Sequence, residues 1–195
     1  MNDFTPTGWD ILDEARTMLR TAVAGVAADG WNLPTPCEQW SAVQVLQHAA
    51  LDQLVWASAL SGAAMPGENP FAPSGQLAGE PLAYAEQALD ASVQAWTAID
   101  TELVPSPLPQ GEMAPELAAG AAALDAAIHA WDIAVATGQG SPLTAKLARS
   151  LMPVATSIVE PLRAYGAYAA ALEPATADDD AILLCYLGRR PDWAA

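Results

Sequence analysis

Proline and glycine divide this chain into segments that suit long helices. The 195 residues include 16 prolines and 13 glycines, and between their clusters apolar residues recur every three to four positions. In the first segment Ile11, Leu12, Ala15, Leu19 and Val23 keep this spacing. Alanine is abundant, whereas threonine, isoleucine and phenylalanine are sparse, which favours helices over sheets. The sequence therefore predicts an all-α protein.

Six segments are expected to be helical. Their approximate ranges are 7–28, 41–60, 80–103, 115–137, 144–165 and 177–187. Ser41 and Gln44 fit a capping box, Gly138 fits the position that ends the fourth helix, and Pro153 is expected to kink the fifth. The Gly- and Pro-rich stretch 62–79 can span a bundle at ~3.3 Å per residue. These features predict an up-down-down-up four-helix bundle with additional C-terminal helices.

The charge of the chain excludes two classes of partner. Seven Lys and Arg oppose 23 Asp and Glu, giving a formal net charge of −16. Such a chain repels nucleic-acid phosphates and anionic lipid head groups. We therefore expect a small-molecule substrate and neither nucleic acid nor a membrane as partner. From its length, the chain is expected to form a single domain over residues 1–195, as a monomer or homodimer.

The sequence gives no sign of secretion or membrane insertion. No apolar run reaches ~18 residues without a polar interruption, and residues 1–14 lack the basic and apolar regions of a signal peptide. Cys37 and Cys185 lie far apart, which argues against a disulfide scaffold and favours a reducing compartment. A cytoplasmic location is the expectation.

The two histidines, His48 and His129, both fall within predicted helices. Asp125 stands four residues before His129, so the two side chains share a helical face, which apolar neighbours place toward the interior. At ~1.5 Å rise per residue, His48 lies roughly 10 Å from the start of its helix and His129 roughly 12 Å from the end of its own. If the helices are antiparallel, the depths match. Two imidazoles and a carboxylate are typical of a catalytic divalent-metal site.

The spacing leaves other interpretations open. Both histidines can be core residues, with Asp125 pairing with His129 along the helix. His48 can instead pair with Asp52, which follows it by four residues in the same helix. Because such pairs are common by chance, spacing alone does not choose between these arrangements.

Three stretches together resemble one protein family. Residues 31–51 (WNLPTPCEQWSAVQVLQHAAL), 124–138 (LDAAIHAWDIAVATG) and 183–193 (LLCYLGRRPDW) resemble the actinobacterial DinB-like metal-binding proteins. These are related to the N-terminal domain of mycothiol-dependent maleylpyruvate isomerase. The stretches occur in the family's order and extend over most of the chain. The resemblance implies a four-helix bundle that binds a divalent ion, zinc first and nickel second, with mycothiol as a candidate cosubstrate.

Carried over residue by residue, the resemblance assigns His48, Asp125 and His129 as the metal ligands. One position departs from the isomerase, which has glutamate where this chain has Asp125, one methylene shorter. The isomerase's C-terminal domain has no counterpart before Ala195. Maleylpyruvate isomerisation itself is therefore not expected.

Two main functions follow as hypotheses. The first is a metal-dependent enzyme that uses a low-molecular-weight thiol, either as a mycothiol-type S-transferase or as a thiol-assisted isomerase; hydrolysis by metal-activated water is a variant. The alternative is a non-catalytic bundle that binds metal or a small molecule. A third hypothesis is a structural or interaction protein that has lost the metal site, in which Asp125 only pairs with His129.

Other reactive residues are interpreted as structural. Cys37 is expected to pack at the entry to the second helix, and Cys185 in the core. Arg189 and Arg190 are expected to lie in a solvated C-terminal turn. Most of the seven tryptophans are expected to fill the core and helix ends, and the acidic residues to form a solvated surface.

Overall fold

The computed structural model describes residues 7–194 and contains helices but no β-strand in this range. The first six residues, part of the stretch in which no signal peptide is expected, lie outside it. The α-helices are α1 (Asp10–Ala24), α2 (Ala42–Ser61), α3 (Pro81–Thr97), α4 (Pro115–Ala136), α5 (Ala145–Ala164) and α6 (Asp179–Tyr186), with one short 3₁₀ helix, η1 (Gly30–Asn32). The predicted all-α class is confirmed.

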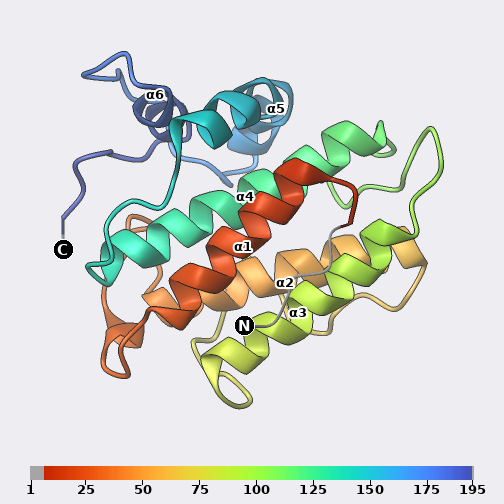
Figure 1. Ribbon diagram of the computed structural model, residues 1–195, viewed down its shortest axis with the longest axis horizontal. Coiled ribbons are helices and arrows are strands. Elements are labelled where there is room, and N and C mark those ends of the chain that lie inside the picture. Colours follow the sequence, from red (N-terminus) through yellow and green to blue (C-terminus); the bar gives the residue numbers. More distant parts are fainter. Residues whose placement is uncertain (1–6, 195) are drawn as a thin grey trace.

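The first four helices form the bundle (Figure 1). Helices α1 and α4 run in one direction, and α2 and α3 in the other, which is the predicted up-down-down-up order. The stretch 62–79 runs back along the bundle and connects the parallel pair α2 and α3. α5 packs on the outer side of α4, and α6 packs on α5. Helices α2 and α4 are therefore antiparallel neighbours.

The expected start and stop signals account for most helix boundaries. The Ser41 and Gln44 capping box is present at the start of α2, where it satisfies free backbone groups. Gly138 adopts a left-handed conformation (φ 74°) just after α4. Helix α3 ends at Thr97, earlier than predicted. The N–H groups of Ala98 and Ile99 bond to carbonyls three residues back, which closes the last turn, and Val104 then pairs with Met113 in an antiparallel bridge.

The central helix, α4, is buried along nearly its whole length. It is also the one helix in residues 7–194 that is long and apolar enough to cross a membrane, with a mean hydropathy of 1.2, but 89% of that window is buried by its neighbours. Its many alanines and Gly120 present little bulk, so adjacent helices can approach closely. The core helix of a bundle has the same properties.

We expect Gly120→Ala to destabilise the fold moderately. A Cβ atom at this position would lie 2.6 Å from Cγ2 of Val154 on α5, and overpacking of this kind costs ~1–3 kcal/mol. The gain in helix propensity offsets up to ~1 kcal/mol of this cost. Urea unfolding measures the net change. The control is Gly67→Ala, where an added Cβ meets nothing within 4 Å; equal stability of the two variants would contradict the expected crowding.

Candidate metal centre

His48 on α2 and the pair Asp125 and His129 on α4 meet between these helices. Nε2 of His48 lies 3.3 Å from Oδ1 of Asp125, and Nε2 of His129 lies 3.4 Å from the same oxygen. The two imidazole rings are 4.7 Å apart, centroid to centroid. The structure thus brings together all three residues that the sequence assigns as ligands.

The helix geometry explains this convergence. The i,i+4 spacing puts Asp125 and His129 on one face of α4, and the antiparallel direction of α2 brings His48 to the same depth. Both histidines are only 6% exposed, while the Asp125 side chain keeps 17% of its surface accessible. The group is therefore set inside the bundle with one side reachable from solvent.

The outer nitrogens of both histidines are already engaged. Nδ1 of His48 lies 2.8 Å from the carbonyl oxygen of Pro70, in the stretch 62–79, and because a carbonyl only accepts, Nδ1–H donates. Nδ1 of His129 lies 2.9 Å from Oδ2 of Asp132. Hydrogen bonds of this kind orient metal-binding histidines and direct Nε2 to the ion. Both Nε2 atoms here face Asp125.

The donor set fits a divalent cation. Ligands that surround a tetrahedral ion at ~2.0–2.2 Å lie roughly 3.3–3.5 Å from one another, and the two N···O separations are 3.3 and 3.4 Å. Oδ2 of Asp125 is buried and has no hydrogen-bond partner within residues 7–194. A buried carboxylate oxygen without a partner is costly, and a cation between the three groups would satisfy it.

The charges of neighbouring groups affect the pKa values of Asp125 and His129. Burial by itself would raise the pKa of Asp125, but His129 and His48 outweigh it and hold that pKa well below its usual range. Burial would likewise lower the pKa of His129, whereas Asp125, Asp132 and Cys37 raise it well above its ordinary value. The two histidines thus favour the carboxylate form of Asp125.

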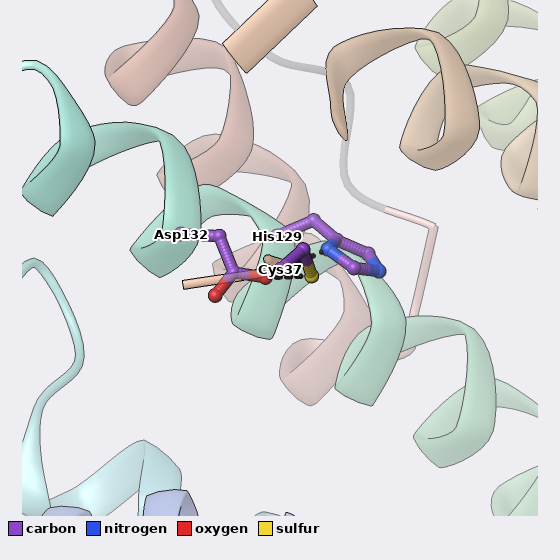
Figure 2. A group of neighbouring side chains, drawn as sticks. All are labelled: Cys37, His129 and Asp132. Carbon is purple, nitrogen blue, oxygen red and sulfur yellow. Dashed lines mark hydrogen bonds and ion pairs between the residues drawn. The ribbon is translucent and has the colours of Figure 1, made fainter. Parts of the chain in front are cut away.

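A second group of metal-ligating side chains adjoins the first. Cys37, His129 and Asp132 also bring potential ligand atoms close together, and Figure 2 shows the Asp132 carboxylate directed toward both the His129 ring and the Cys37 thiol. This position already contains a cation, since Nη2 of Arg189 lies 3.0 Å from Oδ2 of Asp132 and 3.2 Å from Sγ of Cys37. A metal ion there would face the guanidinium charge, so the group around Asp125 is the better candidate.

The placement of Arg189 corrects one prediction. The sequence suggested a solvated turn, but the Arg189 side chain is only 10% exposed and pairs with the fully buried Asp132. Only Arg190 points outward, 69% exposed and paired with Asp192. The assignment of acidic residues to the surface is wrong for Asp132 for the same reason, because its charge is balanced inside the protein.

The cysteines and tryptophans divide between core and site. Cys185 is buried, as predicted. Cys37 is half-buried and its sulfur contacts Asp132 and Arg189, so its role is more polar than helix-entry packing. Trp40 lies against both His48 and His129, with ring centroids 4.8 and 6.5 Å away. Three tryptophans are fully buried in the core: Trp56, Trp96 and Trp131.

Two more acidic residues near the centre have raised pKa values. Asp52, the alternative partner of His48, has no hydrogen bond to its Oδ2 from any residue between 7 and 194, and burial and Asp125 raise its pKa well above the usual range. Burial and Asp125 also raise the pKa of Tyr168 to about 12. No sequence pattern indicated Tyr168, because it lies in the irregular segment between α5 and α6.

Comparisons with known proteins agree with this architecture. The family model described as the mycothiol maleylpyruvate isomerase N-terminal domain matches residues 12–134, a range that contains all three residues of the candidate centre. Uncharacterized proteins from two strains of Mycobacterium tuberculosis are each 31% identical over 157 residues, covering 75% of this chain and 76% of theirs. No solved structure matches.

Proposed function

This chain belongs to the mycothiol maleylpyruvate isomerase N-terminal domain family, and from that premise we propose that it is a metal-dependent enzyme acting with a low-molecular-weight thiol. His48, Asp125 and His129 would hold one divalent ion, with zinc as the first choice for two imidazoles and a carboxylate. The observation that carries the proposal is the approach of two Nε2 atoms to a single carboxylate oxygen.

The residues around the proposed centre, the ion and the thiol would each have a separate role. The Pro70 carbonyl and Asp132 hold the two imidazoles in the orientation that directs both Nε2 atoms toward Asp125. When bound, the ion would supply the Lewis acidity that keeps a thiol deprotonated near neutral pH, although a free thiol has a pKa of ~8.5. Three protein ligands leave a position for that sulfur. S-transfer to an electrophile and thiol-assisted isomerisation both use such a thiolate.

The surroundings favour an uncharged thiol. All seven Lys and Arg side chains form an ion pair with a carboxylate. An anionic group on the substrate would therefore have to compete with an existing ion pair. Aromatic rings lie beside the histidines instead: Trp40 contacts both, and the exposed Phe71 has its ring centroid 5.9 Å from that of His48. Mycothiol, which is nearly neutral, is compatible with this setting.

Calorimetric titration of mycothiol tests the proposal. We expect binding heat when mycothiol at millimolar concentration is added to metal-loaded protein, and none with metal-free protein. Cys37→Ala should largely retain this heat, because Cys37 is not among the three proposed ligands. No heat with the metal-loaded wild type would favour the non-catalytic binding bundle, and a loss confined to Cys37→Ala, with fold and metal retained, would place the chemistry at Cys37.

A further inference from the structure

We propose that Arg189 is a positioning residue for the metal ligand His129 and acts through Asp132. The inference rests on the proposed function, since it concerns how the chain prepares its own ligand. It extends the candidate centre to the C-terminal turn, which lies beyond the residues 12–134 that the family model matches.

Arg189 holds the Asp132 carboxylate through two parallel contacts. Its Nε lies 3.2 Å from Oδ1, and its Nη2 lies 3.0 Å from Oδ2. A two-point guanidinium contact fixes the plane of a carboxylate, which a single point charge does not. Oδ2 of the same carboxylate accepts from Nδ1 of His129 at 2.9 Å. The orientation of the His129 ring is thereby connected to the C-terminal segment.

The local sequence explains why Arg189 turns inward. After α6, Gly188 adopts φ 78°, a left-handed conformation that favours glycine. The backbone N–H of Arg189 then donates to the carbonyl of Leu184 at 2.8 Å, which is the bond that closes a helix end of the Schellman type. A Cβ atom on Gly188 would lie 2.8–3.0 Å from Ala169 and Ala170. The turn is therefore tightly packed, and the side chain that follows it, Arg189, points toward Asp132 on α4.

Charge and burial make this contact consequential. Asp132 is fully buried, so its carboxylate depends on partners inside the protein, and Arg189 and His129 are those partners. A carboxylate paired with a guanidinium forms a stronger hydrogen bond to the His129 Nδ1–H than a neutral oxygen does. Cys37 adds a third contact, with its sulfur 3.2 Å from Oδ2 of Asp132. Three parts of the chain meet at this carboxylate: the loop that precedes α2, helix α4 itself, and the C-terminal turn.

The test compares metal affinity in the full chain without a histidine tag. Co²⁺ is titrated against a competing chelator into the wild type, Arg189→Met and Arg190→Met. We expect Arg189→Met to weaken Co²⁺ binding roughly 10–100-fold, the usual effect of losing an outer hydrogen bond to a ligand, and to alter the visible absorption of bound Co²⁺. Arg190→Met is the matched control, since the Arg190 side chain is exposed and pairs with the exposed Asp192. This variant should bind Co²⁺ as the wild type does.

The remaining outcomes are also decisive. If Arg189→Met does not fold, the double variant Asp132→Asn with Arg189→Met removes both buried charges and leaves an amide acceptor for His129; its affinity should still fall by about tenfold or more. Wild-type affinity and an unchanged Co²⁺ spectrum in the folded variant would overturn the inference, as would equal weakening in Arg190→Met. A wild type that binds no Co²⁺ would instead overturn the proposed function.

Discussion

Replacement of His129 by alanine is expected to abolish metal retention. The substitution removes one of three proposed ligands, and of the two histidine contacts of Asp125 it leaves the one to Nε2 of His48 at 3.3 Å. Wild-type protein purified without a histidine tag should carry about one divalent ion per chain, and His129→Ala close to none, by elemental mass spectrometry after gel filtration. The binding heat of mycothiol should disappear in the same variant.

A matched variant separates loss of a ligand from loss of structure. Asp52→Asn changes a buried acid one helical turn from His48, and the amide keeps nearly the same size and shape. Burial disfavours the charged form of Asp52 and raises its pKa well above the usual range, so we expect the loss of its charge to be tolerated. Asp52→Asn should retain the ion. Metal loss in Asp52→Asn with retention in His129→Ala would support the alternative His48 and Asp52 pair.

Replacement of Asp132 by alanine is expected to cause a large loss of stability that does not depend on metal. The substitution leaves the Arg189 guanidinium, only 10% exposed, without its carboxylate. Breaking a buried ion pair from one side costs about 3–5 kcal/mol. Urea unfolding of metal-free protein at pH 7 measures this. Asp192→Ala, which breaks an exposed pair, should cost about 1 kcal/mol or less, and similar losses in both variants would contradict the account.

The effect of Asp132→Ala should also depend on pH in one direction. The folded-state pKa of Asp132 is below its unfolded value, so the carboxylate contributes stability above pH ~4 that is lost as the pH falls. The difference in unfolding free energy between wild type and Asp132→Ala should therefore be largest near neutral pH and shrink toward pH 3. A difference that grows on acidification would contradict the ionised pair.

Local pattern was sufficient for the bundle and for part of the site. Helical spacing and the Ser41 and Gln44 capping box identified the helices because these signals act within a few residues. The i,i+4 relation of Asp125 and His129 follows from the helix alone. The approach of His48 required one further assumption, that α2 and α4 are antiparallel, and the family resemblance chose among the pairings that spacing left open.

The outer contacts of the centre could not be read from the sequence. The backbone carbonyl of Pro70 accepts a hydrogen bond from His48. Because every residue type has such a carbonyl, the sequence does not indicate this contact. Arg189 lies 57 positions from Asp132, and its inward direction depends on how α6 packs. The HAWD stretch placed Asp132 three residues after His129, within reach along the helix, and this was the one signal that could have indicated its role.

The central claim is that His48, Asp125 and His129 hold the ion, and anomalous diffraction from zinc-loaded crystals tests it most directly. We expect a single zinc peak with two imidazole nitrogens and one carboxylate oxygen at ~2.0–2.2 Å. A zinc peak bound by the sulfur of Cys37 at ~2.3 Å, beside Asp132, or the absence of any peak among these three residues, would contradict the account.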